Sequence, residues 1–171
     1  MKRLLGFLLL VLVVLVAVAL GGYYASQQNL IPLPTPVDPA TMGAPAVVEY
    51  VHDGDTLFLE DGRKVRLLGI NTPEIGENRE CYGDEATAAL RALLPVGTRV
   101  TVLADVEPLD QYGRSLLFVY TDAGTNVNLE LLAEGAATVE MYQPNVMLRD
   151  ELYSAERAAR DDELGLWGAC R

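Results

Sequence analysis

The fold of this chain is decided by residues 47–70, which read VVEYVHDGDTLFLEDGRKVRLLGI. Three runs rich in valine, leucine and isoleucine alternate here with the turn pairs Asp53-Gly54 and Asp61-Gly62. Such runs between turn residues are typical of β-strands, and an Asp-Gly pair between two of them is a strong hairpin signal. The sequence therefore predicts three consecutive strands, at residues 47–51, 56–59 and 64–70.

The rest of the domain adds two strands and three helices to this prediction. Residues 84–94 place alanine and leucine at helical spacing, and Pro95 and Gly97 end the pattern. Further strands are predicted at residues 99–107 and 115–121, and further helices at 127–134 and 146–163, the last with Asn145 as its N-cap. Five short strands with a helix inserted after the third favour a small closed β-barrel, of the α+β class, over a sandwich.

The first 24 residues predict a segment that engages a membrane. Lys2 and Arg3 precede a run from Leu4 to Tyr24 that contains no charged residue. As a helix this run would reach about 31 Å, just enough for a hydrocarbon core of ~30 Å, so we favour an uncleaved anchor. The alternative is a secretory signal cut after Ala17-Val18-Ala19. In both cases the basic end stays inside and the rest of the chain is extracytoplasmic.

Residues 25–45 contain five prolines and little that could pack, which predicts a stiff, extended linker. We therefore expect the folded domain at residues 46–171. After residue 43 the chain carries 11 of the 13 basic and 23 of the 24 acidic side chains, a net charge of −12 with histidine neutral. Taken alone, this charge argues against a nucleic-acid binder, whose surface is normally basic.

The chain has two cysteines, Cys81 and Cys170. Disulfides persist outside the cytoplasm, so we expect these two to pair, with two separate thiols as the alternative. The chain-entropy model assigns about 4–5 kcal/mol of stabilisation to a bridge that closes so long a loop.

The first candidate functional residues lie in two segments of this domain, around Asp55 and around Arg66. Asp55 follows the Asp53-Gly54 turn, where a carboxylate can meet a hard cation such as Ca²⁺; a solvated acid in a hairpin turn is the alternative. Arg66 shares strand parity with Leu68 and Ile70, which predicts a buried guanidinium that needs a partner. The alternative for Arg66 is a structural ion pair, with Glu49 or Asp55.

Two loops offer the remaining groups that hydrolysis of a phosphodiester requires. Pro73 keeps Thr72 extended, so the Thr72 carbonyl and the Glu74 side chain can turn toward one site. Glu74 is the candidate base, with an ordinary loop acid as the alternative. Residues 110–114, DQYGR, offer Arg114 as a second cation that can fork two phosphate oxygens.

Together these segments resemble the staphylococcal nuclease, or thermonuclease, family over residues 47–167. The motifs occur in the family's order at residues 53–56, 66–74, 82–86, 110–114, 127–135, 142–145 and 166–167. The resemblance implies a five-stranded OB-fold β-barrel with three helices. It also implies a Ca²⁺-dependent enzyme that cleaves DNA and RNA at the 5′-oxygen and leaves 3′-phosphates.

The resemblance also implies roles for individual residues. The catalytic residues would be Arg66, Glu74 and Arg114; the Ca²⁺ ligands would be Asp55, Asn71 and the Thr72 carbonyl; and the nucleotide pocket would be lined by Asp110, Tyr112 and Tyr142. Arg66 would hold the scissile phosphate, and Glu74 would activate or orient water. Arg114 would stabilise the phosphorus centre and the leaving oxygen.

The chain departs from the family pattern at several positions. Asn71 stands where the family has an aspartate, which should weaken Ca²⁺ binding or change the preferred ion. Gln111 and Glu140 replace a lysine and a tyrosine of the best-known member, and residues 75–80 hold only Arg79 where that member is lysine-rich. Fewer phosphate contacts predict weaker substrate binding and a flatter salt dependence.

Three functions remain open from the sequence. The first is an exported, monomeric nuclease, tethered to a membrane if the leader is not cut, that acts on DNA and RNA. The second is a non-catalytic OB-fold module that binds nucleic acid or nucleotide. The third is a surface domain with a structural role.

Overall fold

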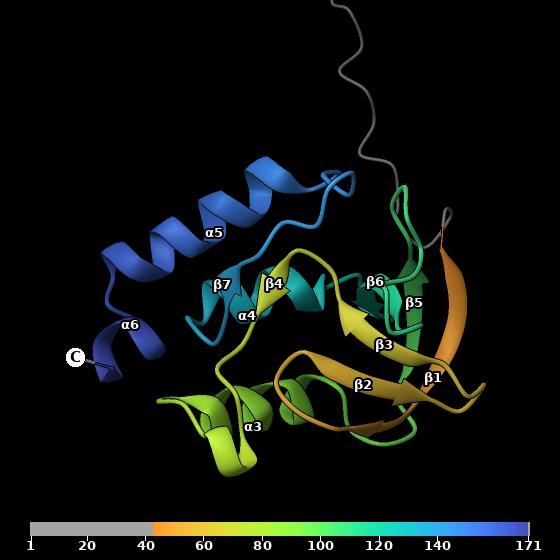
Figure 1. Cartoon of the computed structure of the whole chain (residues 1–171), viewed down its shortest axis with the longest axis horizontal. Helices are drawn as coiled ribbons and strands as arrows, with labels where there is room; N and C mark the ends of the chain where they lie inside the picture. Colours follow the sequence, from red (N-terminus) through yellow and green to blue (C-terminus); the bar gives the residue numbers. More distant parts are fainter. Residues whose placement is uncertain (1–42, 171) are drawn as a thin grey trace, which may run out of the picture. The chain divides into compact units, whose positions relative to one another are not determined.

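The computed structural model describes residues 43–170. The predicted N-terminal hydrophobic helix, and the linker up to residue 42, lie outside the described residues. No helix between residues 43 and 170 has the length and apolar character needed to cross a bilayer. The strands of the described part form a barrel, and helices pack against one side of it (Figure 1).

The barrel is closed and has five strands in the order β1-β2-β3-β6-β5, as predicted. The strands are β1 (Ala44–Val51), β2 (Thr56–Leu59), β3 (Lys64–Leu67), β5 (Arg99–Leu103) and β6 (Ser115–Thr121). Neighbouring strands are antiparallel, except that β3 and β6 run parallel and close the barrel. The α+β class and the OB-fold barrel are thereby confirmed.

The first barrel strand and the strand β5 have different bounds from those expected. β1 begins at Ala44 and includes Pro45, in a part of the strand that pairs only with β5 and where a proline is tolerated. The predicted strand 99–107 ends at Leu103, and an irregular loop leads from there to β6.

The β2–β3 hairpin has the predicted turn, with Gly62 in the left-handed conformation. The third predicted strand, however, does not continue to Ile70. The chain turns at Gly69, whose φ of +80° favours glycine, and a Cβ there would lie 2.5 Å from Leu152 Cδ1. Beyond this turn Ile70–Asn71 forms a separate short strand, β4, which pairs with β7 (Thr138–Val139).

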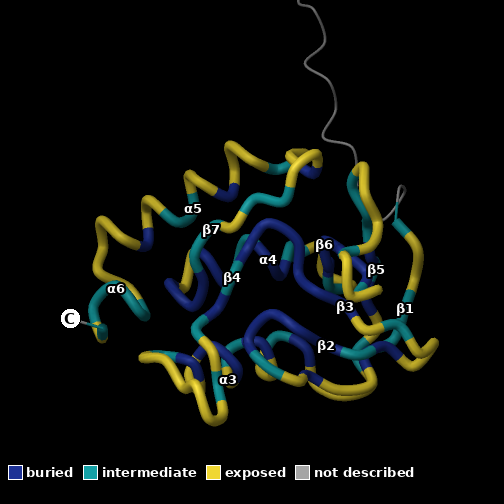
Figure 2. The backbone as a smooth tube through the Cα atoms, in the orientation of Figure 1, coloured by how far each residue is buried: buried dark blue, intermediate teal, exposed yellow. Residues whose placement is uncertain are grey.

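Three longer helices are present, as predicted: α3 (Gly83–Leu93), α4 (Val127–Ala133) and α5 (Arg149–Asp161). A 3₁₀ turn, η1 (Gly76–Asn78), precedes α3, and a short helix, α6 (Leu166–Ala169), follows α5. α4 contacts both α3 and α5. In Figure 2 the outer turns of α5 are exposed, whereas the barrel strands β3 and β6 are mostly buried.

The prediction that Asn145 caps the last helix is wrong. α5 begins at Arg149, after Leu148, which makes no side-chain cap. Asn145 is buried instead: its Oδ1 accepts from the Glu107 N–H at 2.8 Å, and its Nδ2 donates to the Glu107 carbonyl at 3.0 Å. One amide thus satisfies both backbone groups of a residue in the β5–β6 loop, which a cap would have left without this partner.

The predicted pairing of Cys81 with Cys170 is present, with the two Cα atoms 5.8 Å apart. The disulfide joins Cys81, two residues before the start of α3, to Cys170, the residue just after α6. The Arg160 guanidinium lies 4.1 Å from the centre of the Trp167 ring, so α5 and α6 are also held together near this end of the chain.

Asn128 links α4 to the barrel and is fully buried. Its Oδ1 accepts from the Val119 N–H at 3.0 Å, and its Nδ2 donates to the carbonyls of Leu68 (2.9 Å) and Leu117 (3.2 Å). A single side chain therefore satisfies backbone groups of β6 and of the turn that follows β3.

We expect Asn128→Ala to lower the free energy of unfolding by about 3 kcal/mol, because buried backbone groups lose their only side-chain partner. Urea denaturation measures the change. Asn78→Ala, at an exposed position in η1, is the matched control and should change stability by less than about 0.5 kcal/mol. Equal stability of the two variants would contradict this account of Asn128.

Candidate active site

The parallel pairing of β3 with β6 brings the two predicted arginines to neighbouring strands. Arg66 lies opposite Leu116 in this register, and Arg114 comes directly before β6. The charges of both arginines act on the phenol of Tyr142. Burial and the hydrogen bond to Glu140 raise the pKa of Tyr142, whereas the charges of Arg66 and Arg114 both act to lower it. The two guanidinium groups therefore lie within electrostatic range of one phenol.

Arg66 is 3 % exposed, and hydrogen bonds surround its guanidinium. Nη1 donates to the carbonyls of Leu67 (2.9 Å) and Ile70 (2.6 Å). Nη2 donates to Asn71 Oδ1 at 2.8 Å and to Glu140 Oε2 at 3.2 Å, and it lies 3.2 Å from Asp55 Oδ2. The ion pair with Asp55 that the sequence allowed is thus present, inside the predicted site.

Asp55 is buried in contact with the same guanidinium. Its Oδ2 accepts from the Thr72 N–H at 2.9 Å and from the Thr72 hydroxyl at 3.1 Å. Burial raises the pKa of Asp55, against the charge of Arg66 and the bonds from Thr72. Gly54 allows this close packing, because a Cβ there would lie 2.6 Å from Thr72 Oγ1.

Glu74 lies exposed just beyond this cluster. Its N–H donates to Glu80 Oε2 at 3.0 Å, and its carbonyl accepts from the Glu80 N–H at 2.9 Å. Burial, and then the charges of Asp55, Asp53 and Glu80, raise the pKa of Glu74, whereas Arg66 lowers it. The predicted base is therefore within electrostatic range of the Asp55–Arg66 pair.

A hard cation fits the chemistry of this cluster. The oxygens of Asp55 and Asn71 both lie within 3.2 Å of Arg66 Nη2, so they are close to each other, and both are of the type that Ca²⁺ binds. The mutual repulsion of Asp53, Asp55 and Glu74 would also be relieved by a cation. Residues 43–170 contain no group of three His, Cys, Asp or Glu side chains placed to hold a metal. An ion here would depend on Asp55, the Asn71 amide, backbone oxygens and water.

The 110–114 turn holds the second arginine in place. Asp110 Oδ2 accepts from Arg114 Nε at 2.6 Å, and Asp110 Oδ1 accepts from the N–H groups of Tyr112 and Arg114, both at 2.9 Å. Burial raises the pKa of Asp110, but these hydrogen bonds outweigh it and hold the pKa below its ordinary value. Asp110 thus orients Arg114, while Tyr112 remains 77 % exposed.

In the sequence Glu140 stands out only as a departure from the family pattern, and its position in the site was not predicted. Glu140 Oε2 contacts Arg66 Nη2 at 3.2 Å and accepts from the Tyr142 hydroxyl at 2.7 Å. The available signal was the i, i+2 spacing of Glu140 and Tyr142, which puts both side chains on one side of an extended segment.

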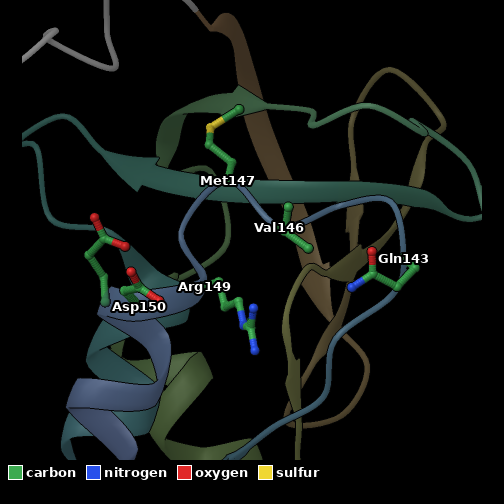
Figure 3. A pocket seen from close by; sticks show the side chains of 6 residues that line it. Gln143, Val146, Met147, Arg149 and Asp150 are labelled. Carbon is green, nitrogen blue, oxygen red and sulfur yellow. The ribbon is translucent and has the colours of Figure 1, made fainter.

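Two other features do not belong to this cluster. Arg79, the one basic residue of loop 75–80, is paired with Asp84 at 2.6 Å. Figure 3 shows a pocket where the chain enters α5, and none of the predicted site residues lines it. Its lining residues are Gln143, Val146, Met147, Arg149, Asp150 and Glu151.

An OB-fold barrel with a buried arginine–carboxylate cluster beside a second arginine defines the class of small nuclease-like OB-fold domains. Within that class, the chain belongs to the staphylococcal nuclease family. The family model "Staphylococcal nuclease homologue" matches residues 64–169, and this match covers more than half of the chain.

Three relatives show how the similarity is distributed. Thermonuclease of Staphylococcus intermedius is 34 % identical over 131 residues, which are 73 % of this chain and 77 % of that protein. Endonuclease YncB of Bacillus subtilis is 35 % identical over 122 residues, 67 % of this chain and 57 % of that protein. Endonuclease YhcR of Bacillus subtilis is 33 % identical over 147 residues, 77 % of this chain, but the match spans only 12 % of YhcR.

The Asp110–Arg114 pair predicts a pH-dependent contribution to stability. Since the pKa of Asp110 is lowered on folding, the contribution is present above pH ~3.9, the ordinary aspartate pKa, and is lost as the pH falls through the folded value. We expect Asp110→Asn to lower the free energy of unfolding by about 1 kcal/mol at pH 7 and by less at pH 3.

Urea denaturation at the two pH values measures this difference. Asp161→Asn, an exposed change in α5, is the control and should have a small effect at both. A loss for Asp110→Asn that stays the same from pH 7 to pH 3 would show that the Asp110 charge is not responsible.

Proposed function

We propose that this protein is an exported, Ca²⁺-dependent nuclease that hydrolyses phosphodiester bonds of DNA and RNA. The observation that carries the proposal is the meeting of Arg66, Asp55 and Asn71. Glu74 is within electrostatic reach of Asp55 and Arg66, and Tyr142 is within electrostatic reach of both Arg66 and Arg114. Membership of a nuclease family supports it.

The residues divide the chemistry as follows. Arg66 and Arg114 bind the oxygens of the scissile phosphate and stabilise the charge that develops on them. Glu74 accepts the proton of a water molecule as its oxygen bonds to phosphorus; its raised pKa suits a general base. The bond from phosphorus to the 5′-oxygen then breaks, the 5′-oxygen takes up a proton from solvent, and a 3′-phosphate remains. Asp55, Asn71 and the Thr72 carbonyl would hold Ca²⁺, which would act as a Lewis acid when bound.

Export is proposed from the N-terminal sequence, in which Lys2 and Arg3 precede a long uncharged stretch. The Cys81–Cys170 disulfide supports this, because such bonds are rare in reducing compartments. On this proposal the folded domain acts outside the cytoplasm, either tethered to the membrane or released.

A non-catalytic module that binds nucleic acid is the second candidate. It is favoured by Asn71, which removes a charge from the cation site, and by Glu140, which contacts the guanidinium that would hold a phosphate. The presence of Glu74 close to the Asp55–Arg66 pair favours the enzyme, because simple binding requires no base there.

Ca²⁺ is expected to control activity. The purified protein should degrade heat-denatured DNA with Ca²⁺ in the buffer and should lose this activity in excess EGTA, with recovery on adding Ca²⁺ back. Acid-soluble nucleotide release measures the rate, and circular dichroism confirms that the fold survives EGTA. No degradation by folded protein at any Ca²⁺ concentration would exclude the proposed catalysis.

Glu74→Gln separates the enzyme from the binding module. We expect kcat to fall by at least ~10²-fold, because the amide cannot accept the proton, while oligonucleotide affinity stays within a few fold. Glu77→Gln, at an exposed position in η1, is the control and should keep normal turnover. If Glu74→Gln retained wild-type kcat, Glu74 would not be the base.

A further inference from the structure

The position of Glu140 is fixed by the backbone that precedes it. Val139 pairs with Ile70 across β7 and β4, and the Glu140 N–H donates to the Gly69 carbonyl at 3.1 Å. The Val139 N–H donates to Glu156 Oε1 at 2.9 Å, which ties the same strand to α5. The Glu140 side chain therefore starts from an ordered strand beside the segment that partners Arg66.

Glu140 covers the side of Arg66 that faces solvent. Arg66 Nη1 donates to two backbone carbonyls, and three side-chain oxygens surround Arg66 Nη2. Among the charged partners of Nη2, the Asp55 side chain is 10 % exposed, whereas that of Glu140 is 45 % exposed. A ligand that approaches Nη2 from solvent therefore meets the Glu140 carboxylate first.

The same oxygen also engages Tyr142. Glu140 Oε2 accepts from the Tyr142 hydroxyl at 2.7 Å while it contacts Arg66 Nη2 at 3.2 Å. A carboxylate resembles a phosphodiester in presenting anionic oxygens to a guanidinium and a hydroxyl. One acidic side chain of the protein thus binds two donors that a substrate phosphate would use.

We propose that Glu140 limits substrate affinity: in the free protein its carboxylate occupies the phosphate position on Arg66 and Tyr142, and it must turn into solvent before a phosphodiester binds. This inference rests on the proposed function. It predicts that Glu140 weakens substrate binding and leaves the chemical step largely unchanged. The exposure of Glu140 gives its side chain room to move away, and the buried Asp55 together with the half-buried Asn71 keeps Arg66 in place.

The test is Glu140→Gln, which keeps the side-chain length and an acceptor oxygen but removes the charge. We expect KM for heat-denatured DNA to fall roughly fivefold, with kcat within about twofold of wild type, because an ion pair of this exposure competes only modestly. Glu140→Ala should lower KM as well. Glu60→Gln, an exposed acid in the β2–β3 turn, is the control and should leave both constants unchanged. Thermal denaturation confirms that each variant is folded.

A binding measurement makes failure of this inference distinguishable from failure of the proposed catalysis. In a Glu74→Gln background with Ca²⁺, the anisotropy of a fluorescein-labelled oligothymidylate should show roughly fivefold tighter binding when Glu140→Gln is added.

If the wild type cleaves DNA but Glu140→Gln changes neither KM nor affinity, only the Glu140 inference is overturned. A fall in kcat at constant KM also overturns it, because Glu140 would then position Arg66 for chemistry. If Glu140→Gln tightens binding but neither the wild type nor any variant turns over DNA, the Glu140 inference is supported and the proposed catalysis is excluded.

Discussion

The structure depends on keeping one charged guanidinium, that of Arg66, inside a protein interior. A buried charge is tolerated only when its hydrogen-bonding groups are satisfied, and loss of one partner leaves an uncompensated charge. The partners of Arg66 come from three separate segments: the turn after β1, the end of β3 together with β4, and the residue directly after β7. The reversal at Gly69 and the short β4–β7 ladder therefore serve the site as much as the fold, because they deliver the Ile70 carbonyl and Glu140.

The parallel contact between β3 and β6 is the second element of this arrangement. It sets Arg114 close to Arg66, although 48 positions separate them in the sequence. The body of the protein is acidic, so under the proposed function attraction of a polyanion would have to come from these two cations and from the Ca²⁺ that the site is proposed to hold. The negative charge of Glu140, which lies next to Arg66, lowers the local positive potential further. The charge distribution favours a protein that binds its substrate weakly.

Local signals predicted most of the fold, and they failed where distant segments decide the outcome. The Asp61-Gly62 hairpin and helix α3 follow from turn chemistry and periodicity over a few residues. The end of β3 at Leu67 depends on β7 and Leu152, far along the chain, so the apolar run to Ile70 concealed it. Asn145 is of a residue type that often caps helices, but its side-chain amide is hydrogen-bonded to the backbone of Glu107 in another loop. The burial of Arg66 was predicted from the sequence. Which residues are its hydrogen-bond partners, Glu140 among them, could be known only from the three-dimensional arrangement.

The disulfide has a consequence for the covalent integrity of the domain. Cys81 and Cys170 enclose β5, β6, β7 and the helices α3 to α6 within one loop of the backbone. A protease that cuts once anywhere inside this loop produces two fragments that remain covalently joined. The cut ends stay at the high local concentration that the bridge imposes, so a nicked molecule keeps every residue of its site. Such a nick would be visible by electrophoresis only after a thiol reagent had opened the bridge.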